Sequence, residues 1–102
     1  LINDWTPEKG DCDQTIMRLK FVGMKDGKEL TETFDLIDYF DKQKNITSMA
    51  RTTGYTCAAV ANIILSGDFK QNGVFTLENF GEEKRLVDNI LHYLSERNIQ
   101  FK

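Results

Sequence analysis

Residues 15–37 read TIMRLKFVGMKDGKELTETFDLI and contain two alternating runs around a turn signal. In the first run, Met17 and Leu19 fall on one face of a strand and Arg18 falls on the other, because successive residues of a strand point to opposite faces. The dipeptide Asp26-Gly27 is typical of a two-residue type I′ loop. These residues therefore predict an antiparallel β-hairpin.

The position of the loop also predicts the register of this hairpin. With Asp26-Gly27 as the loop, Lys25 faces Lys28, and the other partners follow by counting back along both strands. The predicted pairs are Leu19 with Phe34, Met17 with Leu36, Arg18 with Asp35 and Ile16 with Ile37. Apolar residues then face apolar residues and a base faces an acid, so a slip by one residue would destroy both matches.

Two later segments predict helices. The segment Cys57–Leu65 is apolar on nearly every side and precedes Gly67, which suits the left-handed position after a helix. We expect a buried helix there, with Cys57 as a small core residue near its start. A last helix is expected from about Glu82 to Arg97, ending at Asn98, with apolar residues at three- and four-residue steps at Leu86, Ile90, Tyr93 and Leu94.

The expected fold is therefore α+β, with an antiparallel hairpin or small sheet packed against two or three helices. The segment between the two helices, residues 69–80, is expected to be a loop. A chain of 102 residues has room for one modest core, so we expect a single domain over residues 1–102.

The composition argues against two classes of binding partner, nucleic acids and membranes. The chain has 13 basic and 16 acidic side chains, a balance that argues against a nucleic-acid backbone as partner. No apolar run reaches the roughly 18 to 20 residues that span a bilayer, so no membrane partner is expected.

Two cysteines are too few for a disulfide framework, which favours a cytoplasmic location. The start at Leu1 has neither an initiator Met nor the pattern of a signal peptide, and we expect a piece of a longer chain.

The most informative candidate site is Arg51-Thr52-Thr53-Gly54, directly before the expected buried helix. Hydroxyls and a glycine at a helix start leave free backbone N–H groups, and an arginine fork binds carboxylate or phosphate. Structural alternatives are equally physical. The threonines could merely cap the helix, and Arg51 could be solvated or could pair with an acid such as Asp35 or Asp41 inside the domain.

The other candidate residues give weaker indications of a function. His92, the one histidine, is expected at the surface, and Cys57 is expected to be structural. The acids Asp35, Asp38 and Asp41 recur every three residues, but we expect at least Asp35 to be a solvated strand residue and predict no chemical role for the three. No catalytic residue and no metal site is predicted.

A resemblance adds to this interpretation. The run Met49–Ala59, MARTTGYTCAA, followed by Leu65-Ser66-Gly67 and by Gly73-Val74-Phe75 before Glu78, resembles the C-terminal part of the saccharopine dehydrogenase family. The similarity extends upstream to Val22–Lys28 and downstream to Leu94–Ile99, so it covers about residues 13–101.

The resemblance implies a two-domain Rossmann-type oxidoreductase of which this chain is a fragment. Its N-terminal domain would bind NAD(P), and its second, α+β domain would close over the nicotinamide on an amino-acid-derived substrate. Related enzymes interconvert saccharopine with glutamate and aminoadipate semialdehyde, or act similarly on carboxynorspermidine, in lysine or polyamine metabolism. No Gly-x-Gly-x-x-Gly follows a strand here, so no cofactor is expected in the fragment itself, and it should not catalyse hydride transfer alone.

The resemblance also gives the candidate site a role. Arg51, Thr52 and Thr53 would lie on the substrate side of the cleft and bind a carboxylate of a polycarboxylate substrate. A homodimer is a further expectation for the parent enzyme. The competing interpretation is a free-standing binding or dimerisation module without catalytic activity, because a hairpin leaves sheet edges open to another chain.

Overall fold

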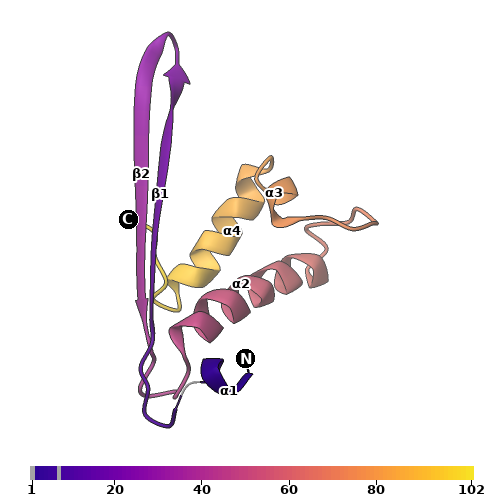
Figure 1. The fold of residues 1–102 in the computed structure, drawn as a ribbon. Helices are drawn as coiled ribbons and strands as arrows, with labels where there is room; N and C mark the ends of the chain where they lie inside the picture. Colours follow the sequence, from indigo (N-terminus) through magenta and orange to yellow (C-terminus); the bar gives the residue numbers. More distant parts are fainter. Residues whose placement is uncertain (1, 7) are drawn as a thin grey trace.

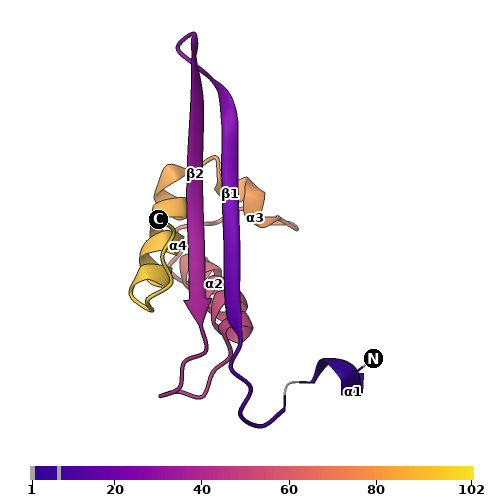
Figure 2. The same ribbon diagram turned by 60° about the vertical axis from the view of Figure 1, so that its left-hand side comes forward.

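The computed structural model describes residues 2–6 and 8–102 and consists of a hairpin beside a helical layer (Figure 1). The elements are α1 (Ile2–Trp5), β1 (Gln14–Lys25), β2 (Lys28–Tyr39), α2 (Ser48–Leu65), α3 (Leu77–Phe80) and α4 (Lys84–Ser95). Helices α2 and α4 lie beside the lower part of the hairpin, and its tip projects beyond them in both ribbon views (Figures 1 and 2). The expected α+β class is confirmed.

The hairpin has the predicted register. Leu19 faces Phe34, Met17 faces Leu36, Arg18 faces Asp35 and Ile16 faces Ile37. The loop residues Asp26 and Gly27 both have positive φ, 52° and 76°, as a type I′ turn requires. Arg18 binds the Asp35 carboxylate through two bonds of 2.7 and 2.8 Å, so the predicted match of base with acid is also confirmed.

The core lies between the helices and the base of the hairpin. Its buried apolar side chains are Leu36, Ala59, Ile63, Phe80, Leu86, Ile90, Leu94 and Ile99. Among the described residues, Leu36 is the hairpin's one fully buried apolar contribution. The remaining apolar side chains of the hairpin are therefore largely or partly open to solvent.

Helix α2 differs from the expected short, buried helix. It begins at Ser48 rather than near Cys57, and the Oγ1 of Thr47 accepts the Ala50 N–H at 3.1 Å as its cap. The threonines expected before the helix lie inside it, where Thr56 donates its hydroxyl to the carbonyl of Thr52 at 2.7 Å. Cys57 is consequently in mid-helix and exposed, so its expected place in the core is wrong.

The C-terminal end of α2 lies before Gly67, as predicted. The left-handed Gly67, with φ 78°, donates to Ile64 O, and Asp68 N–H reaches Ile63 O at 3.1 Å, which is the Schellman pattern. The expectation that this helix is buried all round is wrong, however, because Leu65 is 84% exposed and only one stripe faces the core. None of the helices in the described ranges is both long and apolar enough to cross a membrane.

The expected loop at residues 69–80 contains the short helix α3. Phe80, at its end, is buried and stacks on Phe69 with ring centroids 4.6 Å apart. Phe69 also meets Phe75 edge-on at 5.1 Å. This aromatic contact folds the connection back onto the core, which periodicity alone did not indicate.

The C-terminal segment returns to the hairpin. Helix α4 starts at Lys84, slightly later than expected, and buries Leu86, Ile90 and Leu94 as predicted. Asn98 closes it with φ 61°. The chain then runs beside β2, where the Asp35 N–H donates to Lys102 O at 2.7 Å and the Lys102 N–H donates back at 2.9 Å.

A glycine inside α2 and a glycine just after its C-terminus should respond oppositely to alanine. Gly54→Ala should raise the free energy of unfolding by about 0.5–1 kcal/mol, because Gly54 lies mid-helix and its new Cβ would meet nothing within 4 Å. Gly67→Ala should lower it by about 1–2 kcal/mol, since φ 78° strains an L residue. Urea denaturation of both variants tests this, and two changes of the same sign would contradict the assigned end of α2.

Candidate functional site

A buried ionic cluster, formed by Asp38, Asp41, Ser48 and Arg51, lies where α2 meets the base of β2. Arg51 is 6% exposed and Asp38 is 4% exposed. The Nη2 of Arg51 lies 3.1 Å from Asp38 Oδ1, and its Nη1 lies 3.2 Å from Asp41 Oδ2. The guanidinium thus bridges two carboxylates of the strand end.

Further bonds satisfy the polar atoms of the cluster. Ser48 Oγ lies 2.7 Å from Asp38 Oδ2 and 2.8 Å from Thr15 Oγ1, so Ser48 donates to the carboxylate and accepts from Thr15. Arg51 Nη2 also donates to the carbonyl of Arg97 at 2.8 Å. The cluster therefore ties α2 to both strands and to the turn after α4.

The electrostatic environment favours the ionised forms. The hydrogen bond that Arg51 donates to the Asp38 carboxylate raises the pKa of Arg51 further above its usual value, although burial opposes this. The backbone N–H of Lys44 lowers the pKa of Asp41. Two aspartates and one arginine leave the cluster with one net negative charge, so the cluster by itself repels an additional carboxylate.

Aromatic rings cover the arginines of this region. The Cζ of Arg51 lies 5.8 Å from the centroid of the Tyr55 ring, and the Cζ of Arg97 lies 5.6 Å from the same ring. Arg97 also stacks on Tyr93 at 3.4 Å. These cation–π contacts hold both guanidinium groups against the aromatic rings beside the cluster.

The first turn of α2 is capped from a distant part of the chain. The Asp13 carboxylate accepts the N–H of Ser48 at 2.6 Å and the N–H of Met49 at 2.9 Å. Partial burial raises the pKa of Asp13, but these two bonds outweigh it and the pKa is lowered. The helix N-terminus, the usual position for a bound anion, therefore already holds an anionic side chain.

The three predicted site residues lie inside α2 instead of before it. Thr52 is half-buried and donates its hydroxyl to Ser48 O at 3.0 Å, whereas Thr53 is exposed. Residues two positions apart do not share a helix face, so Thr53 does not converge with Arg51. The alternative that Thr52 or Thr53 caps the helix is wrong, because Thr47 and Asp13 cap it.

The partners of Arg51 match the intramolecular alternative, since Asp41 is one of them and Asp38 is another. Recognition of a substrate carboxylate by Arg51 stays a prediction. It requires the aspartates to release part of the guanidinium. A cavity of about 230 Å³ borders the cluster and is lined by Ile37, Asp38, Tyr39, Asp41, Arg51 and Asn98.

Sequence reasoning missed Asp38 and Asp13. Asp38 is buried because it shares a strand face with the buried Leu36, and its burial was not predicted. That two-residue spacing was a usable signal. Nothing local marked Asp13, which lies far from Ser48 in the sequence and reaches α2 only through the fold.

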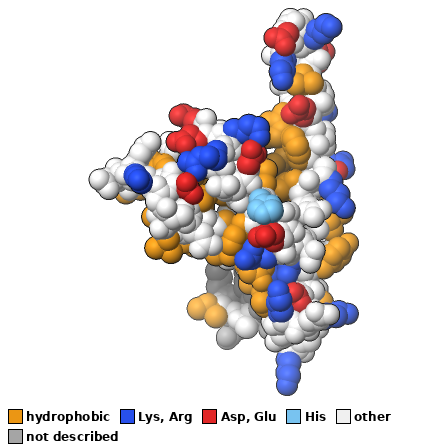
Figure 3. All heavy atoms as spheres, turned by 180° about the vertical axis from the view of Figure 1, so that it is seen from behind, with side chains coloured by type: hydrophobic (Ala, Val, Ile, Leu, Met, Phe, Trp, Pro, Cys, Tyr) orange, Lys and Arg blue, Asp and Glu red, His pale blue; other side chains and the backbone are white. Residues whose placement is uncertain are grey.

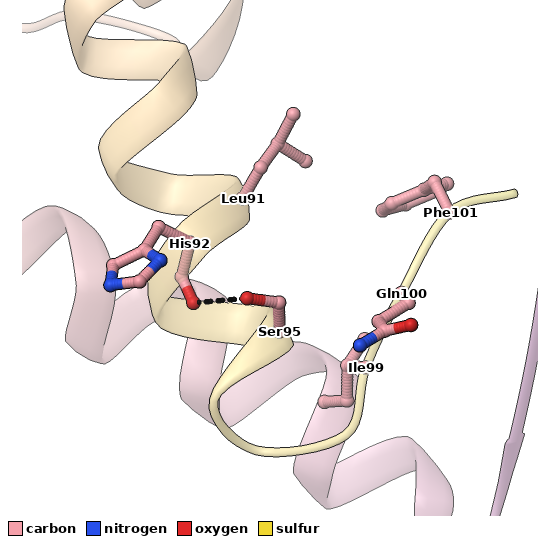
Figure 4. Close-up of a pocket in the computed structure, with 6 residues that line it drawn as sticks. All are labelled: Leu91, His92, Ser95, Ile99, Gln100 and Phe101. Atoms are coloured by element: carbon pink, nitrogen blue, oxygen red, sulfur yellow. Dashed lines mark hydrogen bonds between the residues drawn. The ribbon is translucent and has the colours of Figure 1, made fainter.

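His92 is a surface residue, as expected. It is 75% exposed, with Nε2 3.6 Å from Glu96 Oε1. His92 borders an open cavity of about 350 Å³ beside Leu91, Ser95 and Phe101 (Figure 4). Ser95 Oγ donates to the backbone carbonyl of His92 at 2.8 Å and not to its ring, so this arrangement is not a nucleophile and base pair.

In the part of the chain that the structure describes, no group of acids, His and Cys is placed to hold a metal ion.

Removing Arg51 should be far more damaging than removing the exposed Arg18. Arg51→Ala leaves Asp38 as a buried, uncompensated charge, so we expect a loss of about 3–5 kcal/mol in the free energy of unfolding. The matched variant Arg18→Ala breaks a surface pair and should cost about 0–1 kcal/mol. Equal losses in urea denaturation would show that the buried cluster does not stabilise the fold.

Acid should weaken the Asp13 cap. A carboxyl whose folded pKa is lowered stabilises the fold above its unfolded pKa, about 3.9, and this stability is lost as the pH falls through the folded pKa. We expect Asp13→Asn to be less stable than the unsubstituted chain at pH 7, and the difference to shrink below about pH 4. Asp26→Asn, in a loop that suits asparagine, is the control. A difference independent of pH would argue against the ionised cap.

A comparison with protein families supports the resemblance stated above. The saccharopine dehydrogenase C-terminal domain family matches residues 1–99. No solved structure matches the chain. Because the match covers nearly the whole chain, the protein belongs to the saccharopine dehydrogenase C-terminal domain family.

Proposed function

We propose that this domain is the substrate-side part of a saccharopine dehydrogenase-like oxidoreductase. The enzyme would be NAD(P)-dependent and would act on the C–N bond of an amino-acid-derived substrate. The observation that carries the proposal is the family match over residues 1–99. The fold is compatible with a supporting domain, because its two-stranded antiparallel sheet is unlike the parallel sheet of a dinucleotide-binding domain.

The N-terminus of α2 does not suit the pyrophosphate of a dinucleotide. A pyrophosphate needs free N–H groups at a helix start, but Asp13 occupies those of Ser48 and Met49 and adds a negative charge. When bound, NAD(P) accepts or donates a hydride. We place that chemistry in a separate Rossmann domain of the parent enzyme.

Within the parent enzyme, we propose that the region around Arg51 faces the substrate cleft. The substrate would be an amino-acid-derived polycarboxylate, in lysine or polyamine metabolism, and the enzyme would be cytoplasmic and homodimeric. Arg51, with Thr52 and Thr53 on the same helix, is the proposed source of recognition. Given its aspartate partners, Arg51 would act on the substrate by exchanging one of them for the substrate carboxylate.

The alternative function is a binding or dimerisation module without catalysis. It is favoured by the projecting hairpin, whose apolar side chains stay exposed, such as Met24 at 71% and Val22 at 61%. In an enzyme the same side chains would be covered by the rest of the protein, so the hairpin alone does not discriminate between the two.

Nucleotide binding and turnover separate these functions. Calorimetry of the isolated chain with NAD(P)H should show no heat of binding, and the longer protein that carries a Rossmann domain should form NAD(P)H when saccharopine and NAD(P)⁺ are added. Low-micromolar binding by the isolated chain would show that the cofactor assignment is wrong. A longer protein without turnover on saccharopine or carboxynorspermidine would favour the module.

A further inference from the structure

The outer edge of β1 offers an unpaired row of backbone groups. Both backbone groups of Asp35 bond to Lys102, so they point away from β1, and Arg18–Asp35 is a pair without mutual backbone bonds. Arg18 therefore points its own N–H and C=O away from β2, and the same holds at every second residue. The β1 residues with outward backbone groups are Gln14, Ile16, Arg18, Lys20, Val22 and Met24.

No second strand covers this edge in the described part of the molecule. The sheet there has two strands, and the returning C-terminal segment pairs with β2, on the opposite side of the hairpin. Figure 2 shows β1 without a neighbouring strand along its outer side. A long, straight edge of this kind is a template for strand addition.

Apolar side chains flank the free edge on both faces of the strand. Phe21, on the helix side, is 57% exposed, and Ile16, on the other side, is 67% exposed. Figure 3 shows hydrophobic side chains on the part of the hairpin that projects beyond the helices. An added strand would therefore gain apolar contacts as well as backbone hydrogen bonds.

The charge of the edge selects the partner. Strand β1 carries Arg18, Lys20 and Lys25 and no acid. Arg18 already binds Asp35, whereas Lys20 has no ion pair with any residue that the structure describes. Lys20 and Arg18 lie on the same face, so an acid at alternate positions of an added strand would meet them.

We infer that the free edge of β1 accepts an extended strand of a separate partner polypeptide, in which apolar residues alternate with aspartate or glutamate. A second copy fits less well. Two β1 edges would bring three cations from each copy into one ladder, and the β2 edge of another copy is interrupted at Asp35 by Lys102. The inference rests on the edge and its charge, so it stands or fails independently of the proposed function.

A peptide provides the test. The probe is a synthetic copy of β2, residues 28–39, which carries one lysine and four acids, two on each face of the strand, among apolar residues and threonines. Added to the ¹⁵N-labelled chain at low salt, it should shift the amide signals of Ile16, Arg18, Lys20, Val22 and Met24. Binding should weaken with salt, and a peptide with all four acids changed to lysine should not bind.

Variants of the chain locate the interaction. Lys20→Glu should weaken peptide binding about three- to tenfold, whereas Lys42→Glu, in the exposed loop after β2, should leave it unchanged. Val22→Pro removes one outward N–H and should abolish binding, while its circular dichroism shows whether the hairpin persists. The inference fails if the peptide does not bind, if the lysine peptide binds equally, if the shifts fall on Glu29 and Thr31, or if the chain instead self-associates through β1.

Discussion

The buried guanidinium of Arg51 is the constraint on which the arrangement of the two layers depends. Few apolar contacts join the hairpin to the helices, since Leu36 is the one hairpin side chain buried in the described core. Asp38 and Asp41 bring two carboxylates of the strand end to one cation, and the carbonyl of Arg97 adds the turn after α4. Such a cluster contributes orientation more than net stability, because desolvating the charges offsets much of their attraction. It therefore specifies where α2 sits on the hairpin.

The hairpin itself is specified by local rules, and its tip has little tertiary support. Its turn and cross-strand pairs fix the register, while the helices cover only its lower part (Figure 1). The T-shaped contact between Phe21 and Phe34, with centroids 6.0 Å apart, is internal to the hairpin. An isolated two-stranded sheet is marginal in water, so this element is suited to being completed by further protein.

Features set by short-range pattern could be predicted from the sequence. The hairpin register, the buried stripe of α4 and the left-handed Gly67 all follow from spacing and turn chemistry. Features set by long-range contacts could not. The start of α2 depends on Asp13, and no residue near Asp13 in the sequence indicates this contact. The threonines in the first turns of α2 have low helix propensity, so the sequence did not predict a helix there. Arg51 could be identified from the sequence, but its role in the fold depends on the burial of Asp38, which was not predicted.

A double-mutant cycle on Arg51→Met and Asp38→Asn tests the central claim most directly, with the free energy of unfolding measured by urea denaturation for both single variants and the double variant. If the buried pair sets the position of α2 on the hairpin, each single change should be strongly destabilising. The double variant should then be more stable than the sum of the single losses predicts, with a coupling energy of about 2–3 kcal/mol. A coupling energy near zero would contradict the account, because it would mean that the two layers are held by apolar packing alone.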